Sequence, residues 1–333
     1  MKVLVIGGTL FIGRLLVQEL LQAGHAVAIL HRRRKHPFSK RVENLVADRN
    51  DPVAVRRAIG TRRFEAVFDN VYDWEQGTTA AHVEGTALAF GDNLERYVFM
   101  SSVAAYGDGL NHYESEPLAP DNHSEPYVRN KAMSERALFR LHRKTGFPVV
   151  TFRPPFAYGP GNPFYREAFF WDRLRANRPI IIPGDGTRLM QFAYVKDLVT
   201  ACLRALETPQ AVGEAFNIGN SRPVTQVEAV RALARAAGKS ATLVRVPRER
   251  ILTAGGNVFR DPLYFGEYFD LPPITENVNK LQRVLRVRLT AFDTGLRETY
   301  RWYIRQPKRR TDVSFEQRLI ESAVAPAGSR RAG

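Results

Sequence analysis

Cysteine is almost missing from this sequence, which has 333 residues and a single cysteine, Cys202. One cysteine excludes a disulfide within the chain and is typical of a reducing compartment. No apolar run approaches the ~20 residues that a membrane-spanning helix needs. The opening residues, MKVLVIGG, are too few for the apolar core of a signal peptide. We therefore expect a cytoplasmic protein without a membrane anchor.

Clusters of metal ligands and internal repeats are also missing, and the seven histidines are scattered, so we expect no metal site. Positive charge, in contrast, is abundant: 49 Lys and Arg residues against 34 Asp and Glu residues leave a net charge of +15. Such an excess attracts phosphate-bearing partners, nucleic acid among them. The charge is spread along the chain, however, and no motif interleaves aromatic and basic residues. We therefore expect a small molecule, and not nucleic acid, as the partner.

Short apolar runs alternate with helical patterns in the first half of the chain. β-Branched and apolar runs predict five strands, at residues 2–6, 26–30, 43–48, 64–70 and 96–102. Helical spacing lies between most of them, for example at residues 51–60 and 77–93. This alternation predicts a parallel sheet with right-handed crossovers. The expected fold class is therefore α/β, a Rossmann-type doubly wound parallel sheet with a smaller C-terminal substrate lobe.

The predicted domain boundaries follow from these patterns. Residues 1–152 form a dinucleotide-binding domain, to which a segment at about 191–221 returns. Residues 153–190 and 222–304 form the substrate lobe, and residues 305–333 form a basic, partly disordered tail.

A glycine-rich loop follows the first predicted strand, with the sequence GGTLFIG at residues 7–13. Gly7 permits a tight turn and Gly13 lets the next helix pack closely on the strand. The amides at the start of that helix suit a pyrophosphate. Leu10 stands where many dinucleotide-binding loops have a further glycine, so the loop alone is a moderate signal.

The second predicted strand runs into ILHRRRK, residues 29–35. An acidic residue at this position would bind the adenosine ribose hydroxyls, whereas an arginine accommodates the 2′-phosphate of NADP. Here His31 is followed by Arg32 and Arg33, which favours NADP, although a solvated charge run and a nucleic-acid contact stay open. Asp48, after the third strand, is placed to accept a hydrogen bond from the adenine amino group.

Tyr127 and Lys131 are four residues apart in a predicted helix that follows the serine-rich end of the fifth strand. This spacing places both side chains on one helical face. A lysine ammonium beside a phenol favours the phenolate, which makes Tyr127 a usable acid and base. Ser102 is placed to orient a substrate hydroxyl or carbonyl against it.

These features resemble the extended short-chain dehydrogenases/reductases of the NAD-dependent epimerase/dehydratase family, from residue 1 to about 303. The motifs that carry the resemblance are GGTLFIG (7–13), VADRND (46–51), SSVAAYG (101–107), Tyr127 with Lys131, RPPFAYGPG (153–161) and PGDGTRLMQFAYVKDLV (183–199). The resemblance implies that Tyr127 is the general acid/base and Ser102 its hydrogen-bonding partner. Lys131 would bind the nicotinamide ribose and tune the tyrosine.

The resemblance also implies two further groups of residues and an assembly. The cofactor-binding residues would be Gly7, Thr9, Leu10, Phe11, Ile12, His31, Arg32, Arg33, Asp48, Arg49, Val71, Lys131 and Pro154, with NADP expected and NAD possible. The substrate-binding residues would be Ser102, Tyr127, Phe156 and Arg188. Relatives often pair through the helices that flank the sheet, so a homodimer through residues 77–93 and 126–145 is expected.

Several positions depart from the pattern of sugar-nucleotide epimerases. Phe156 and His82 replace usual asparagines, and Met190 replaces an arginine that grips the substrate diphosphate. The expected function is an NAD(P)-dependent epimerase or dehydratase, acting on a carbinol or carbonyl carbon of a sugar nucleotide or a related hydroxylated metabolite. Two alternatives remain: an NADPH-dependent carbonyl reductase with a non-nucleotide substrate, and a catalytically silent RNA-binding protein. Leu10 is typical of a subgroup that includes chloroplast stem-loop-binding proteins.

Overall fold

The computed structural model describes residues 1–91, 93–307 and 312–324. The chain divides into two compact units. The first comprises Met1–Asn162, Gln191–Arg222 and Ile274–Thr290. The second comprises Pro163–Met190, Pro223–Pro273 and the described residues from Ala291 onward.

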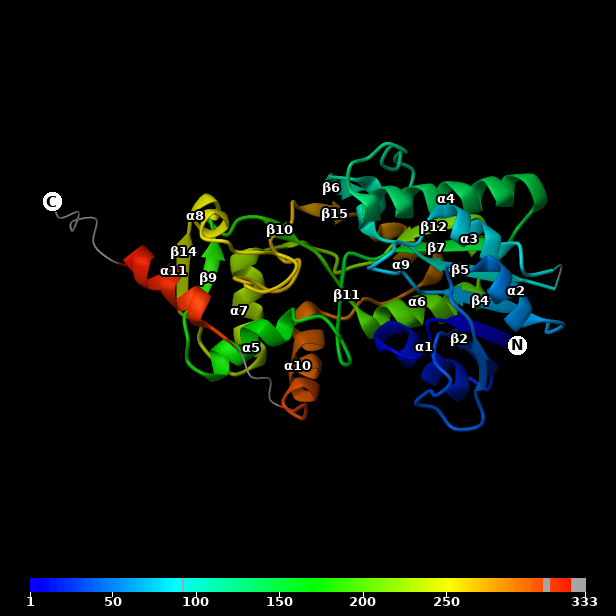
Figure 1. Cartoon of the computed structure of the whole chain (residues 1–333), viewed down its shortest axis with the longest axis horizontal. Helices are drawn as coiled ribbons and strands as arrows, with labels where there is room; N and C mark the ends of the chain where they lie inside the picture. The colour runs from blue at the N-terminus through cyan, green and yellow to red at the C-terminus, as the bar shows by residue number, and fades with distance from the viewer. Residues whose placement is uncertain (92, 308–311, 325–333) are drawn as a thin grey trace. The chain divides into compact units, whose positions relative to one another are not determined.

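A seven-stranded parallel sheet forms the centre of the first unit, in the order β12-β7-β5-β4-β1-β2-β3. Figure 1 labels β12, β7, β5, β4 and β2 of this sheet. Its strands are β1 (Lys2–Ile6), β2 (Ala26–His31), β3 (Glu43–Val46), β4 (Ala66–Asp69), β5 (Arg96–Met100), β7 (Val149–Arg153) and β12 (Glu214–Asn217). The five strands predicted from the sequence and the fold class are confirmed. Strand order reverses beside β1, and in such sheets ligands bind at the carboxyl ends of the strands around that point.

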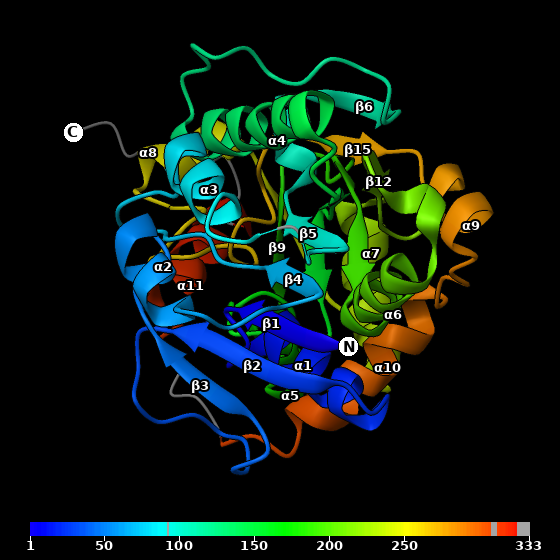
Figure 2. The same ribbon diagram turned by 90° about the vertical axis from the view of Figure 1, so that its right-hand side faces the viewer.

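Helices cover both faces of this sheet. They are α1 (Phe11–Gln22), α2 (Pro52–Ile59), α3 (Ala80–Ala87), α4 (Pro126–Thr145), α6 (Val195–Glu207) and α9 (Asn279–Leu285). Figure 2 shows α2, α3 and α4 on one face and α1 and α6 on the other. Each face buries its own apolar core, one containing Leu4, Val55 and Leu138 and the other Val5, Leu16 and Cys202.

Local sequence explains where several of these helices begin. Asp51 caps α2 by accepting from the amides of Val53 and Ala54, and Pro52 fits the first turn because its missing amide is not needed there. Thr79 caps α3 in a reciprocal box with His82. His82 thus has a structural partner at this position.

The remaining elements of the first unit are short. The strand pairs are β6 (Gly109–His112) with β15 (Ile274–Glu276) and β8 (Phe156–Tyr158) with β11 (Phe192–Tyr194); the 3₁₀ turns are η1 (Val103–Tyr106) and η2 (Pro209–Ala211). Residues 274–290 were predicted to lie in the substrate lobe, yet they pack in the first unit. The reason is that β15 pairs with β6, while Leu281 and Leu285 join the core under α1 and α6.

The second unit combines helices with two strand pairs. They are α5 (Glu167–Arg175), α7 (Gln226–Ala236), α8 (Arg248–Thr253), α10 (Phe292–Tyr303) and α11 (Ser314–Val324), with β9 (Ile180–Pro183) beside β14 (Leu243–Val246) and β10 (Leu189–Met190) beside β13 (Val224–Thr225). In the described ranges, none of the helices has the length and apolar character needed to cross a membrane.

Part of the predicted basic tail is helical. Within it, residues 314–324 form helix α11, where Glu316 makes a buried ion pair with Arg173 and Leu319 is buried. The sequence pattern missed this because the anchoring partner lies 143 residues away. Residues 308–311 and 325–333 of the predicted tail lie outside the described residues.

Candidate active site

The loop between β1 and α1 has the form that a pyrophosphate needs. Gly7 has a φ of +83°, and a Cβ on Gly7 would run into Val71. A Cβ on Gly13 would collide with the carbonyl oxygen of Gly7, so only glycine lets the helix approach the loop this closely. Leu10 precedes α1 and gives its first amides no side-chain cap, which leaves them to a ligand.

Leu10 and Phe11 have unusual surroundings for apolar residues. Leu10 is 60% exposed, and Phe11 has a φ of +42°, in the left-handed region that bulky side chains rarely adopt. Thr9 and Ile12 flank them in the same loop and are half-buried. Strain of this kind concentrates at ligand sites.

Asn70, directly after β4, is a residue that the sequence reasoning missed. Among the described residues, neither its side-chain oxygen nor its side-chain nitrogen has a hydrogen-bond partner, although both atoms are buried. The backbone of Asn70 lies next to Gly7. A buried amide without partners is costly, so it marks a place where a ligand completes the bonding. The signal in the sequence is an asparagine at the end of an apolar strand.

The end of β2 has a different electrostatic character from the one predicted. The His31 ring bonds Asn44, at 2.8 Å, and burial lowers the pKa of His31 below its usual value. Arg32 and Arg33 are exposed. Arg32, however, makes an ion pair with Asp73, which comes from the loop after β4. A fixed negative charge is therefore present at this edge after all.

Asp48 and Arg49 follow β3 and have distinct surroundings. Asp48 is half-buried and accepts from the Asn50 amide at 2.8 Å. Arg49 is buried, forms an ion pair with Asp69 and donates to the His82 carbonyl and the Thr86 hydroxyl. The Arg49 guanidinium is thus held in the core of the first unit.

Lys131 lies at the centre of the predicted catalytic set. It is 5% exposed, and its ammonium donates to the Met100 carbonyl at 2.6 Å, at the carboxyl end of β5. The Nζ atom is 5.9 Å from the centre of the half-buried Tyr127 ring. Burial lowers the pKa of Lys131 to about 8, against the attraction of the Asp69 carboxylate. A cation is therefore held against the tyrosine in a site from which water is largely excluded.

Ser102 lies two residues beyond Met100, the last residue of β5. It is 8% exposed and caps η1, its oxygen accepting from the Ala104 amide at 3.2 Å. Its hydroxyl also faces the Pro154 carbonyl at 3.5 Å, and that carbonyl accepts from the Val103 amide. Ser102 and Pro154 are thus brought together, as are Tyr127 and Lys131.

An aromatic cluster that the sequence reasoning missed covers Tyr127. Trp74 stacks on the Tyr127 ring, with centres 4.8 Å apart and planes 22° apart. Tyr72 meets the same ring edge-on at 4.7 Å. Both come from the loop after β4, in the segment NVYDWEQG. Aromatic residues at the carboxyl end of a parallel strand were the signal for them.

The predicted substrate residues belong to different units. Phe156 begins β8, with its ring 6.0 Å from that of Phe192. Arg188 lies in the second unit, where it and Arg248 both bond the buried carboxylate of Asp270. Met190, in β10, is buried.

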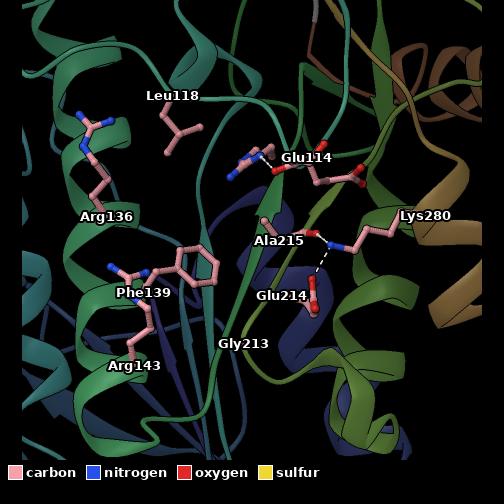
Figure 3. A pocket seen from close by; sticks show the side chains of 11 residues that line it. Glu114, Leu118, Arg136, Phe139, Arg143, Gly213, Glu214, Ala215 and Lys280 are labelled. Atoms are coloured by element: carbon pink, nitrogen blue, oxygen red, sulfur yellow. Dashed lines mark hydrogen bonds and ion pairs between the residues drawn. The ribbon is translucent and has the colours of Figure 1, made fainter.

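A separate pocket of about 410 Å³ lies at the β12 edge of the sheet (Figure 3). It is lined by α4 residues such as Arg136 and Phe139, by Glu214 of β12 and by Lys280 of α9. Lys280 bonds Glu214 and the Ala215 carbonyl, which shields the outer edge of the strand. None of the predicted catalytic or cofactor residues lines this pocket.

A family model supplies the decisive comparison. The model of the NAD dependent epimerase/dehydratase family matches residues 3–219. The chain belongs to this family. The resemblance drawn from the motifs is therefore confirmed.

Individual family members resemble the chain over part of their length. It is 33% identical over 254 residues to the chloroplast stem-loop binding protein of 41 kDa b of Arabidopsis thaliana, covering 71% of this chain and 63% of that protein. It is 32% identical over 177 residues to the dTDP-D-glucose 4,6-dehydratase of Mus musculus, covering 52% of this chain and 46% of that protein. The chain thus spans less than two thirds of these curated relatives.

Solved structures share the fold. The UDP-glucose 4-epimerase of Thermus thermophilus, in complex with NAD, superposes with a TM-score of 0.72 at 24% identity, over 92% of this chain and 99% of that one. The dTDP-glucose 4,6-dehydratase of Bacillus anthracis gives a TM-score of 0.73 at 19% identity, over 91% and 96% of the chains. At these identities the likeness speaks for the fold alone.

Proposed function

We propose that this chain is a nicotinamide-dinucleotide-dependent enzyme that moves a hydride to or from a carbinol or carbonyl carbon. The observation that carries the proposal is the buried Lys131 ammonium beside Tyr127, at the carboxyl end of β5. Burying a lysine in this way is costly. A chain that used this edge only for packing would have no physical need for the charge.

The residues at the edge of the sheet fit a dinucleotide. Gly7 and Gly13 leave no room for a Cβ, the first amides of α1 have no side-chain cap, and the amide of Asn70 is buried without a partner in the described chain. These groups would hold the pyrophosphate, while Asp48 would bind the adenine and Lys131 the nicotinamide ribose. The cofactor, when bound, supplies the hydride chemistry.

Tyr127 carries the proton that accompanies the hydride. Its phenol would protonate a carbonyl oxygen or accept the proton of a carbinol, and the Lys131 charge favours the phenolate between these steps. The Ser102 hydroxyl would hold the same substrate oxygen by a hydrogen bond. Trp74 and Tyr72 pack on the Tyr127 ring and would hold the phenol in position.

The substrate that we propose is a sugar nucleotide or a related hydroxylated metabolite. Relatives whose names describe UDP-glucose and dTDP-glucose dehydratases support it. Met190 is buried and stands where the resemblance implies an arginine that grips the substrate diphosphate, whereas Arg188 and Arg248 both pair with Asp270. A carbonyl reductase with a non-nucleotide substrate remains the alternative. An epimerase or dehydratase returns the hydride to the substrate and a reductase does not, and this difference depends on how the substrate binds and not on Tyr127.

Replacing Tyr127 with phenylalanine tests the proposal. We expect NADH binding to change little and turnover of an identified substrate to fall by ~100-fold or more, the scale of one lost acid/base. Substrate screening with both cofactors comes first. Unchanged turnover in the variant would refute the role of Tyr127.

NADP(H) binding is part of the proposal, and it rests on Arg32 and Arg33. An arginine pairs with a phosphate through two charge-assisted bonds, each worth ~1.5–3 kcal/mol before solvent screening. We therefore expect Arg32→Ala combined with Arg33→Ala to weaken NADPH selectively in calorimetry. Equal weakening of NADH would contradict the phosphate site.

RNA binding is the second candidate function. It is favoured by the similarity to a chloroplast stem-loop binding protein and by the net charge of +15. Phosphate contacts would make binding fall steeply with salt. Salt-dependent binding of a stem-loop RNA that survives saturating NADPH would support this function, and no binding at low salt would exclude it.

A homodimer in the cytoplasm completes the proposal. The single cysteine is buried in α6, in keeping with a reducing compartment. Pairing would use α3 and α4, which pack side by side on one face of the sheet.

A further inference from the structure

An ion pair spans the edge of the sheet at which the dinucleotide would bind. Arg32 follows β2, and its Nη1 atom lies 3.3 Å from Oδ2 of Asp73, which follows β4. Strand β1 lies between β2 and β4 in the sheet. Because neighbouring strands are ~4.8 Å apart, the pair bridges the carboxyl end of β1, where the Gly7 loop begins.

Asp73 is the fixed partner of the two. Its Oδ1 atom accepts from the amides of Glu75 and Gln76, both at 2.9 Å, and its own amide donates to the buried hydroxyl of Thr78. These bonds, that of Gln76 above all, lower the pKa of Asp73, so the carboxylate stays ionised. The Arg32 side chain is 65% exposed, against 9% for Asp73. The exposed Arg32 side chain thus pairs with an Asp73 carboxylate whose position is fixed by its own hydrogen bonds.

We propose that Asp73 is a specificity-determining residue, which restrains the preference of Arg32 for the 2′-phosphate of NADP(H) and thereby admits NAD(H). The inference rests on the proposed dinucleotide function. Asp73 takes the place of the acidic residue that is missing at the end of β2, but it comes from another strand.

The physical argument is competition for one guanidinium. To bind a 2′-phosphate, Arg32 must leave Asp73 and bring a dianion toward a carboxylate that cannot move away. The negative charges of the 2′-phosphate and the Asp73 carboxylate would then repel each other. NAD(H) lacks that phosphate, so Arg32 can stay paired with Asp73 when it binds. Asp73 Oδ2 can also accept hydrogen bonds from the ribose hydroxyls of NAD(H). Asp73 therefore penalises NADP(H) and spares NAD(H).

Calorimetric titration of the full chain with NADPH and with NADH tests the proposal. Asp73→Asn removes the charge but keeps an oxygen for the amides of Glu75 and Gln76, since asparagine forms the same turn. We expect the dissociation constant for NADPH to fall on the order of tenfold, equivalent to about 1.4 kcal/mol. The constant for NADH should stay the same or rise.

The effect must act through Arg32. In an Arg32→Ala background, Asp73→Asn should therefore change the dissociation constant for NADPH less than about threefold. The remaining change would come from direct repulsion between the Asp73 carboxylate and the 2′-phosphate. Asp121→Asn is the matched control, because Asp121 also forms an ion pair with an arginine, Arg136 of α4, and neither residue belongs to the cofactor-binding set. It should leave both constants unchanged.

Two results would overturn the proposal. One is an unchanged ratio of the NADPH and NADH constants in Asp73→Asn, and the other is the full effect persisting without Arg32. If the native chain binds neither cofactor, the proposed dinucleotide function fails and this inference with it. That outcome differs plainly from binding with an unchanged ratio.

Discussion

At the residue scale, Lys131 combines burial with charge. Its pKa is lowered from 10.5 to about 8 by desolvation, with Asp69 and Glu135 opposing the shift and Arg49 adding to it. Below about pH 8 the folded chain must bury a charged ammonium. Between about pH 8 and 10.5 the unfolded chain binds more protons than the folded one, so the free energy of unfolding rises with pH in this window.

We therefore expect Lys131→Met to remove this pH dependence. Urea denaturation should be measured for wild type and variant at about pH 7 and about pH 10. Between these two pH values, the unfolding free energy of the wild type should rise by about 3 kcal/mol relative to that of the variant. Lys144→Met, on the exposed end of α4, is the control and should give no such change. Parallel pH profiles for Lys131→Met and wild type would contradict the buried charge.

At the scale of elements, a buried ion pair anchors helix α11. Arg173 and Glu316 are 3% and 6% exposed, and Arg173 also donates to Tyr165 and the Phe169 carbonyl. Removing one partner of a buried pair leaves the other charge uncompensated. Glu316→Ala should therefore destabilise the second unit by about 3 kcal/mol in chemical denaturation.

Glu321→Ala in the same helix is the comparison, because Glu321 is exposed and bonds only Gln317 among the described partners. Its effect should stay within about 0.5 kcal/mol. Similar losses for both variants would mean that α11 contributes as an exposed helix and not through Arg173.

At the scale of the whole molecule, the expected dimer can be tested by substituting two equally exposed leucines. Leu88 directly follows α3, Leu110 lies in β6, and each is 54% exposed. If α3 and α4 form the interface, Leu88→Glu places a charge in it and Leu110→Glu does not. Light scattering at micromolar concentration should give a dimer mass for the wild type and Leu110→Glu, and a monomer mass for Leu88→Glu. A monomeric wild type would refute the dimer.

The sequence was sufficient wherever the determining interactions are local. The alternation of strands and helices, the glycine loop and the four-residue spacing of Tyr127 and Lys131 all depend on neighbours in the chain. For the same reason, the five strands of the first half were predicted at nearly their observed positions. Whether Ser102, Tyr127 and Lys131 catalyse a reaction remains a prediction.

Only the tertiary structure decided which distant residues share the candidate site. Asp73 meets Arg32 across 41 positions of the chain, and Trp74, in the loop after β4, stacks on Tyr127 of α4. Parallel strands bring their carboxyl ends to one edge however far apart they lie in the chain. The sequence alone therefore shows that HRRRK is a positively charged run. Which carboxylate pairs with it, here Asp73, depends on the order of the strands in the sheet.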